Sequence, residues 1–216
     1  MPISVFFLDF DKYDVNDLKK YLYNKNINLA NFNNQQKIVS HFIRYFVLEE
    51  FYNISSPVFF YKFGKPYLNN DRFFFNISHT NTKIIMAVGY QDIGIDIEDI
   101  SRKRNIDKIS RRYFSELENK KLSTSDNFIQ DFYILWTLKE SQVKRDSLGI
   151  AKGFSDAIFD KVNEKWVSNN YPNDFCTFSY DNAIISICSK DISTAKFNFF
   201  EIIDFKFIPV CKIRNL

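Results

Sequence analysis

The order of secondary structure implied by the sequence constrains the fold more than any single motif. Apolar runs typical of strands cover residues 3–10, 58–63, 73–77 and 83–90, and helical patterns cover residues 14–24 and 35–52. The second half has a similar order: a strand at 93–98, helical patterns at 105–114 and 132–149, then strands at 157–159, 175–180, 183–188 and 196–207. We therefore expect an α+β fold with an internal pseudo-repeat and two lobes, residues 1–90 and 91–216.

Polar stretches between these elements predict loops, turns and one helix start. Residues 24–34 are rich in asparagine and predict a loop. Gly64-Lys65-Pro66, Ser78-His79-Thr80 and Asp181-Asn182 predict turns, the last of them a hairpin. Ser115 and Glu118 match the S-x-x-E capping box, so a helix should begin there.

Composition excludes several classes of protein. The 216 residues are 45% hydrophobic, which is ample material for a core, and the net charge is only +3 without the dense basic stripe of a nucleic-acid-binding protein. No apolar run is long enough to span a bilayer, and the start of the chain lacks the pattern of a signal peptide. Three cysteines without CxxC spacing and two histidines argue against zinc and for a reducing compartment. We expect a cytoplasmic protein with no nucleic-acid or membrane partner.

The predicted strand at residues 93–98 carries two acids on one face. Ile93, Ile95 and Ile97 alternate with Gly94, Asp96 and Glu98, so the isoleucines should face a core and the acids the other side. An exposed strand face would simply solvate these carboxylates. In a partly buried place they would repel each other and raise each other's pKa unless a cation lay between them.

The predicted helix at residues 132–149 adds a third acid. Glu140 and Lys144 are four residues apart and rise from the same face, a spacing that also occurs on any solvated surface helix. If Glu140 joins Asp96 and Glu98, three carboxylates suit Mg²⁺, which prefers oxygen ligands and keeps positions for water and phosphate.

Side chains that bind phosphate accompany these acids. His79 alone would be an ordinary turn histidine, but it lies among Ser78, Thr80 and Lys65, and Lys139 and Lys144 add cations beside the acids. Together these groups describe a site for a magnesium–pyrophosphate substrate. The chain has neither GxxxxGK[ST] nor GxGxxG, so it is not a P-loop or Rossmann protein.

Five motifs in this order carry a resemblance to a known family. GKP, FNISHT, GIDIED, RYFSELE and FYILWTLKESQVK, between about residues 35 and 159, resemble the 4′-phosphopantetheinyl transferases of the surfactin-synthetase-activating (Sfp) type. WxxKE-x3-K together with GIDIE at this separation is specific, whereas neither motif alone would be. The resemblance implies two similar α+β lobes related by a pseudo-twofold axis, with coenzyme A bound and the active site formed in the cleft between them.

The resemblance also assigns roles to individual residues. It implies that Asp96, Glu98 and Glu140 ligate Mg²⁺ and that His79 and Lys144 contact the pyrophosphate of coenzyme A. Further coenzyme contacts are implied for Ser78, Thr80 and Lys65, near the adenosine 3′-phosphate, and more loosely for Arg44. Glu118 is typical of the family, although helix capping explains it equally well. Residues 31–36, NFNNQQ, depart from the basic segment of many relatives, so coenzyme A could bind more weakly.

The implied reaction transfers phosphopantetheine from coenzyme A to a serine of an apo acyl or peptidyl carrier protein. Glu140 would accept the serine proton, directly or through a metal-bound water, and Lys144 would assist the leaving adenosine 3′,5′-bisphosphate, with Lys139 a weaker candidate. A catalytically impaired relative and an unrelated Mg²⁺-dependent pyrophosphate hydrolase remain as alternatives. Two lobes in one chain complete the cleft without a second copy, so a monomer is expected.

Overall fold

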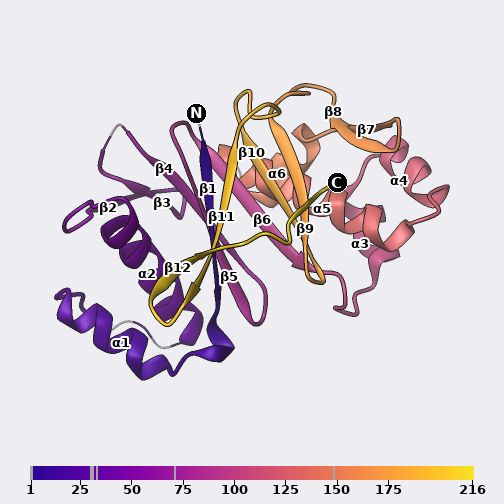
Figure 1. Cartoon of the computed structure of the whole chain (residues 1–216). Helices are drawn as coiled ribbons and strands as arrows, with labels where there is room; N and C mark the ends of the chain where they lie inside the picture. Colours follow the sequence, from indigo (N-terminus) through magenta and orange to yellow (C-terminus); the bar gives the residue numbers. More distant parts are fainter. Residues whose placement is uncertain (1, 30–31, 33, 71, 148) are drawn as a thin grey trace.

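Two antiparallel-rich sheets form the centre of the molecule. The computed structural model describes residues 2–29, 32, 34–70, 72–147 and 149–216. A five-stranded sheet has the order β12-β11-β1-β5-β4 and a four-stranded sheet the order β13-β9-β10-β6, while β2–β3 and β7–β8 are separate hairpins (Figure 1). Helices and strands both contribute strongly, so the predicted α+β class is confirmed.

The elements follow the predicted order. The first half contains β1 (Ile3–Asp9), a 3-10 turn (Phe10–Lys12), α1 (Val15–Asn24), α2 (Gln35–Phe46), a π-helical turn (Val47–Phe51), β2 (Phe59–Lys62), β3 (Lys65–Leu68), β4 (Phe74–His79) and β5 (Lys83–Gly89). The second half contains β6 (Ile93–Asp99), α3 (Ile106–Tyr113), α4 (Glu116–Ser123), α5 (Phe128–Asp146), α6 (Ile150–Asp156), β7 (Phe159–Val162), β8 (Lys165–Ser168), β9 (Phe175–Tyr180) and β10 (Ala183–Ser189). The chain ends with β11 (Phe197–Ile203), β12 (Lys206–Pro209) and β13 (Arg214–Asn215).

The two halves share one strand arrangement. β1 pairs antiparallel with β5, which pairs with β4, and in the same way β6 pairs with β10, which pairs with β9. The registers correspond, since Ser4 lies opposite Val88 and Gly94 lies opposite Cys188. The end of the chain crosses this division, because β11 pairs parallel with β1 and β12 follows it in the first sheet. The boundary at residues 90/91 stays a prediction.

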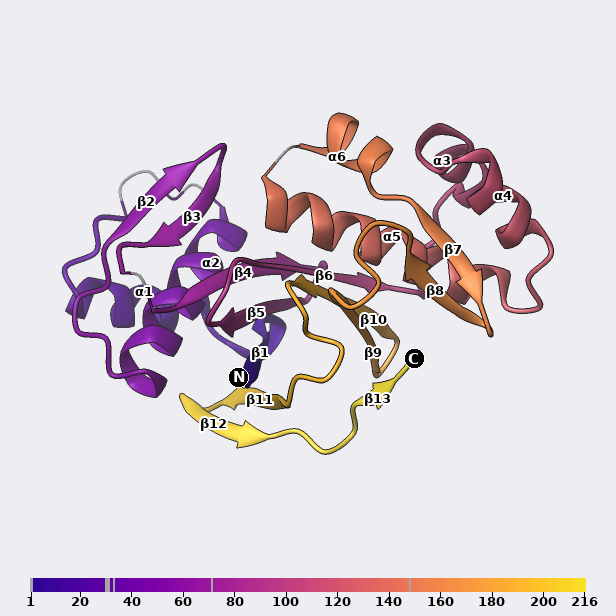
Figure 2. The ribbon, with the colours of Figure 1, turned by 90° about the horizontal axis from the view of Figure 1, so that it is seen from above.

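An apolar core lies between the two sheets. It joins the isoleucines of β6 to apolar residues of β1, β5, β9 and β10: Ile93, Ile95 and Ile97 with Ile3, Val5, Phe7, Ile85, Ala87, Phe178 and Ile185. Figure 2 shows the molecule from above, with α1 and α2 at one end, α3 to α6 at the other, and the sheets between them. α5 packs on β6 and β10, so it covers the face of β6 that carries the acids.

Local sequence explains how the site helices begin and end. Ser115 and Glu118 form the predicted capping box in front of α4, and each side chain accepts a hydrogen bond from the other residue's backbone N–H. α5 begins at Phe128, earlier than the prediction from residue 132, and ends where Ser147 takes a left-handed conformation with φ 56°. Within the described residues, no helix is long and apolar enough to cross a bilayer.

Two predicted turns and one predicted strand need correction. The turn before β3 is formed by Phe63 and Gly64, both with positive φ, so Lys65 and Pro66 belong to the strand. Ser78 and His79 likewise belong to β4, which pairs with β5 beyond the predicted end at residue 77. The predicted strand at 196–207 is a hairpin, because Asp204 and Phe205 turn with positive φ between β11 and β12. Short elements such as α6, β8 and β13 were not predicted.

Candidate active site

Close packing of α5 on β6 brings the predicted acids together. A side chain at Gly94 would collide with the backbone of Ser141 and Arg145, so only glycine allows the helix to lie this close to the strand. α5 therefore presents Glu140 and Lys144 to the face of β6 that carries Asp96. The i, i+4 pair on the helix is therefore half-buried beside β6 and does not lie on a fully solvated surface.

Asp96, Ser78 and Lys144 form one bonded cluster. The Lys144 ammonium lies 2.6 Å from Asp96 Oδ1 and donates to Ser78 Oγ at 2.8 Å, and the Ser78 hydroxyl donates to the same Asp96 oxygen at 2.8 Å. Asp96 is only 4% exposed, and its other oxygen, Oδ2, is buried without a hydrogen-bond partner among the described residues. A buried carboxylate oxygen without a donor is costly, so this atom points to a missing partner.

Glu98 is held in place by two other residues. Arg104 Nη2 lies 2.6 Å from Glu98 Oε2, and the Trp136 indole Nε1 donates to Glu98 Oε1 at 3.2 Å. Burial, and then the negative charge of Asp96, raise the pKa of the Glu98 carboxyl, while Arg104 opposes both. The predicted same-face repulsion between the two acids is thus present.

Glu140 completes the group of acids. Its carboxylate makes no hydrogen bond to a described residue, and it lies within electrostatic reach of Asp96, Glu98 and Lys144. Burial, followed by the charge of Asp96, raises the pKa of Glu140 to about 7, although Lys144 acts in the opposite direction. Three carboxylates therefore face two cations, Lys144 and Arg104, so the site carries an excess of negative charge when all three acids are ionised.

These carboxylates provide the donor chemistry of a hard divalent cation without forming a preassembled metal centre. Across the described ranges, no group of three or more His, Cys, Asp or Glu side chains is arranged to hold a metal ion. Glu98 is already engaged by Arg104 and Trp136, whereas no described residue donates a hydrogen bond to Asp96 Oδ2 or to the Glu140 carboxylate. Carboxylate oxygens are the ligands that Mg²⁺ prefers, so the residues fit such an ion.

The phosphate-binding candidates on β4 have different surroundings. His79 is exposed at the end of the strand, and its ring makes no hydrogen bond or ion pair within the described part of the chain. Thr80 Oγ1 accepts hydrogen bonds from the backbone of Lys83 and Thr82 and thereby closes the turn. Only Ser78 is joined to the acidic cluster.

Lys139 is not brought to the acids, contrary to the sequence prediction. Its ammonium is 1% exposed and lies 2.9 Å from Glu118 Oε1, with the carbonyls of Phe154 and Ala157 as further acceptors. Glu118 is fully buried and also accepts from the backbone N–H of Phe159 at 2.9 Å. This buried ion pair links α4, α5 and the start of β7, so Lys139 and Glu118 have a structural role.

Lys65 and Arg44 also lie apart from the cluster. The Lys65 ammonium is buried against Asp92 and two backbone carbonyls, so the predicted phosphate contact does not fit its surroundings. Arg44 is buried on α2, where it donates to Tyr61 Oη at 3.2 Å and to the Ser40 carbonyl. Within the described residues, neither cation contacts Asp96, Glu98 or Glu140.

Two residues that the sequence did not single out, Asn76 and Arg104, also bond to β6. Asn76 Oδ1 accepts a hydrogen bond from the Ile95 backbone at 3.0 Å, and Ser78 Oγ is 3.4 Å from the Ile97 N–H. Side chains of β4 thus bond the backbone of β6, an edge strand of the other sheet. Asn76 could have been found from its position two residues before Ser78, on the same strand face. Arg104 had no comparable signal, because it lies in an irregular segment.

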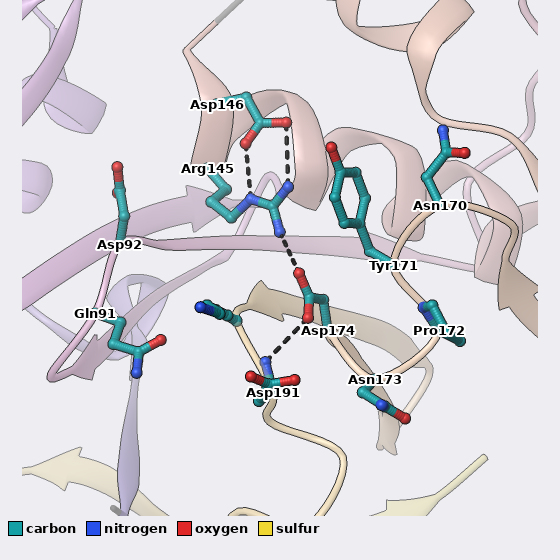
Figure 3. Close-up of a pocket in the computed structure, with 11 residues that line it drawn as sticks. Gln91, Asp92, Arg145, Asp146, Asn170, Tyr171, Pro172, Asn173, Asp174 and Asp191 are labelled. Carbon is teal, nitrogen blue, oxygen red and sulfur yellow. Dashed lines mark hydrogen bonds and ion pairs between the residues drawn. The ribbon is translucent and has the colours of Figure 1, made fainter.

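A hollow of about 620 Å³ lies near the end of α5, and Figure 3 shows the residues that line it. The charged side chains beside α5 are paired with one another: the Arg145 guanidinium bonds Asp146 and Asp174, and Tyr171 lies against it. None of Asp96, Glu98 or Glu140 lines this hollow. It therefore has no part in the chemistry proposed below.

Comparison with known proteins agrees with this geometry. Residues 92–188 match the 4′-phosphopantetheinyl transferase superfamily. This segment contains Asp96, Glu98, Glu140 and Lys144, which the structure brings to one place. The chain therefore resembles the Sfp-type 4′-phosphopantetheinyl transferases, as its motifs indicated.

Individual relatives extend the same finding. The chain is 35% identical over 112 residues to the 4′-phosphopantetheinyl transferase gsp of Aneurinibacillus migulanus, covering 50% of this chain and 42% of the relative. It is 38% identical over 93 residues to the 4′-phosphopantetheinyl transferase Sfp of Bacillus subtilis, covering 42% and 41%. The matched regions thus span about two fifths of the length of these relatives.

A solved structure matches more distantly. The holo-[acyl-carrier-protein] synthase of Thermotoga maritima is 22% identical with a TM-score of 0.37, covering 46% of this chain and 63% of that chain. This likeness is too low to support an argument about the site.

Proposed function

We propose that the chain is an Sfp-type 4′-phosphopantetheinyl transferase. It moves phosphopantetheine from coenzyme A to a serine of an apo acyl or peptidyl carrier protein. The observation that carries the proposal is the bonded cluster of Asp96, Ser78 and Lys144 with Glu140 beside it, built mainly from the segment that matches the superfamily.

In this proposal Asp96, Glu98 and Glu140 hold Mg²⁺. The buried, unpaired Asp96 Oδ2 supports this assignment, as do the raised pKa values of the Glu98 and Glu140 carboxyls. When bound, Mg²⁺ would offset negative charge on the pyrophosphate oxygens. Arg104 and Lys144 would be the counter-ions of these acids in the metal-free protein.

Side chains of the cluster account for the remaining chemistry. The carrier serine oxygen forms a bond to the β-phosphorus of coenzyme A, and the phosphorus–oxygen bond to the nucleotide breaks. Glu140 is the candidate base that accepts the serine proton, because its carboxylate accepts no hydrogen bond from a described residue. The positive charge of Lys144 would stabilise the negative charge on the adenosine 3′,5′-bisphosphate as it leaves.

The coenzyme would be held by residues at the rim of the cluster. His79 and Lys144 are the candidates for the pyrophosphate, since His79 is exposed and Lys144 is 28% exposed. Ser78 would act mainly by orienting Asp96, and Thr80 by shaping its turn, with the adenosine 3′-phosphate nearby. Arg44 stays a looser candidate, because Tyr61 and Ser40 already accept from it.

Release of adenosine 3′,5′-bisphosphate tests the reaction. The protein, Mg²⁺ and coenzyme A are incubated with an apo carrier protein, with the same carrier after serine-to-alanine substitution, or with no carrier. The transferase predicts nucleotide release only with the intact serine. Release without any carrier would identify a pyrophosphate hydrolase, and no release with several carriers would favour an impaired binding relative.

Cellular location and assembly remain part of the proposal. Cys176, Cys188 and Cys211 are free thiols, which agrees with a cytoplasmic enzyme. A monomer is proposed because the acids and the cations of the cluster come from one chain. Residues 31 and 33 of the NFNNQQ segment lie outside the described residues, so the predicted effect on coenzyme A affinity stays a prediction.

A further inference from the structure

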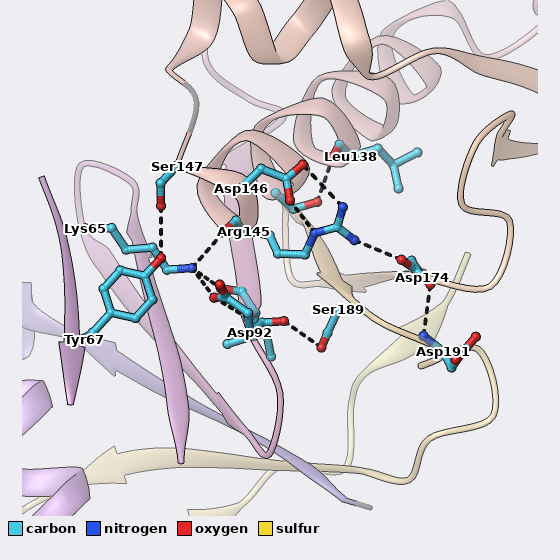
Figure 4. Close-up of polar contacts among 12 residues, drawn as sticks. Lys65, Tyr67, Asp92, Leu138, Arg145, Asp146, Ser147, Asp174, Ser189 and Asp191 are labelled. Carbon is cyan, nitrogen blue, oxygen red and sulfur yellow. Dashed lines mark hydrogen bonds and ion pairs between the residues drawn. The ribbon is translucent and has the colours of Figure 1, made fainter. Parts of the chain in front are cut away.

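The β2–β3 hairpin of the first half reaches across to the end of α5 (Figure 4). Lys65 and Tyr67 are two residues apart on β3, so their side chains leave the same face of the strand. Lys65 contacts Asp92, Ile93 and Arg145, and Tyr67 contacts Ser147. Two neighbouring side chains of one half thus hold one helix end of the other.

Every donor of the Lys65 ammonium is in use. It lies 2.6 Å from Asp92 Oδ1, 3.0 Å from the Ile93 carbonyl and 3.1 Å from the Arg145 carbonyl. An ammonium has three donors and no acceptor, so three acceptors satisfy it. The side chain is 6% exposed. A phosphate could reach Lys65 only by taking it away from these partners.

The contacts lie where α5 needs them. The last carbonyls of a helix have no partner inside the helix, and a cation near the C-terminus interacts favourably with the helix dipole. Lys65 supplies both a donor and a charge to the Arg145 carbonyl. Ser147, the left-handed residue that ends the helix, donates its N–H to the Val143 carbonyl at 2.8 Å, and its Oγ is 3.2 Å from Tyr67 Oη.

The same turn is held from its other side. The Arg145 side chain bonds Asp174 at 2.9 Å and lies over the Tyr171 ring, which fixes the turn to the loop before β9. Lys144 belongs to this turn, and its ammonium lies 2.6 Å from Asp96. A shift of the turn would therefore move Lys144 relative to Asp96.

We propose that Lys65 is a positioning residue that fixes the last turn of α5 and thereby sets the place of Lys144 at the site. It is not a ligand of the adenosine 3′-phosphate. The inference rests on the proposed transferase function, because Lys144 matters only if phosphates bind beside it.

Coenzyme A and 3′-dephospho-coenzyme A distinguish the two roles. Lys65→Met should lower kcat about 10- to 100-fold with both coenzymes, because small misplacements of a reacting group cost rate. The ratio of kcat/KM for coenzyme A to kcat/KM for 3′-dephospho-coenzyme A should stay within about twofold of the wild-type ratio, because Lys65 does not contact the 3′-phosphate. Lys62→Met is the matched control, since Lys62 is an exposed lysine opposite Lys65 in the hairpin. A ligand of the 3′-phosphate would instead lose kcat/KM for coenzyme A alone, and that result would overturn the proposal.

Amide hydrogen exchange tests the same claim without any transfer. In coenzyme-free protein, the amides of residues 143–147 should exchange faster in Lys65→Met and in Tyr67→Phe than in wild type and Lys62→Met. Unchanged exchange in both variants would overturn the positioning role even if wild type is fully active. If wild type shows no transfer while the variants exchange faster, the proposed function is refuted. The contacts of Lys65 and Tyr67 with the end of α5 would still be shown to stabilise that helix end. Tyr67→Phe decides the exchange test if Lys65→Met fails to fold.

Discussion

The two halves of the molecule place very different side chains at the same positions. Phe6 of β1 lies opposite Met86 of β5, and Asp96 of β6 lies opposite Ser186 of β10. Leu8 and Glu98 correspond in the same way. In the first half Phe6 and Leu8 are core residues, whereas in the second half the same positions carry two acids of the candidate site.

The difference shows why the acids are perturbed. The fold buries this strand face in both halves, since a helix packs over it each time. Apolar side chains are satisfied there without partners, but carboxylates need cations and donors. Ser78, Lys144 and Arg104 supply some of these, and the unpaired Asp96 Oδ2 with the raised pKa of Glu140 marks what is still missing.

Placing an acid in the first half should break the comparison most severely. Phe6 is fully buried, with the rings of Phe51, Tyr52, Phe200 and Phe207 around it. Phe6→Asp is expected to lower the free energy of unfolding by more than about 4 kcal/mol, because no cation faces the new charge. Urea unfolding measures it, and Phe6→Leu is the control, at about 1–2 kcal/mol. Equal losses in both variants would show that a buried, unpaired carboxylate costs nothing beyond the lost aromatic packing, which would contradict the contrast between the two strand faces.

Two lysines of α5 should separate in the same manner. Lys139→Met leaves the fully buried Glu118 unpaired and should cost about 3–5 kcal/mol of stability. Lys144→Met should abolish most transfer and cost clearly less stability than Lys139→Met, because Lys144 is 28% exposed and Ser78 still donates to Asp96. Denaturant melts and transfer assays on both variants check this. A stable Lys139→Met protein without activity would restore the sequence prediction that Lys139 acts in catalysis.

Removing the central acid should affect activity more than folding. Asp96→Ala is expected to reduce transfer at least about 100-fold, because the cluster loses the group that Ser78 and Lys144 orient. Its thermal midpoint should stay nearly unchanged or rise, as a source of repulsion on Glu98 and Glu140 disappears. Asp99→Asn, at the end of the same strand, is the control and should keep its activity. A folded Asp96→Ala protein with full activity would refute the metal assignment.

The smallest effect on stability is expected for His41 on α2, a helix that carries Lys37 and Arg44 but no acidic residue. His41 packs on Phe32, its Nδ1 is buried without a described hydrogen-bond partner, and burial followed by the charges of Arg44 and Lys37 lowers its pKa to about 4. In the unfolded chain the pKa of a histidine is about 6.5. Between these values the unfolded chain binds more protons, so the contribution of His41 to stability is lost as the pH falls from 6.5 toward 4.

His41→Gln should remove this dependence. Relative to the variant, wild type should lose about 1 kcal/mol between pH 7 and pH 5, a value reduced for the partial exposure of the ring. Urea unfolding at several pH values gives the difference directly. Parallel pH profiles for the two proteins would show that His41 titrates normally in the fold.

The sequence predicted the parts of the site that depend on local spacing. Alternation in residues 93–98 placed Ile95 and Ile97 in the core and Asp96 and Glu98 together, and the i, i+4 spacing placed Glu140 and Lys144 on one helix face. These relations depend only on the period of a strand or a helix, so they survive folding unchanged.

Other parts were set by contacts far apart in the chain. Lys139 and Lys144 look alike in sequence, and only the fold brings Glu118 to the first and Asp96 to the second. Lys65 was assigned to a phosphate because its acceptors come from residues 92, 93 and 145, which no local pattern connects to the hairpin. Periodicity also could not show that α5 is buried on most of its faces.

The intact mass of an apo carrier protein tests the central claim most directly. Carrier is incubated with the protein, Mg²⁺ and coenzyme A, and its mass is compared with samples that contain Glu140→Gln or lack coenzyme A. The account predicts one phosphopantetheine adduct on the carrier serine with wild type and almost none with Glu140→Gln. Unmodified carrier after incubation with wild type, across acyl and peptidyl carriers alike, would contradict it.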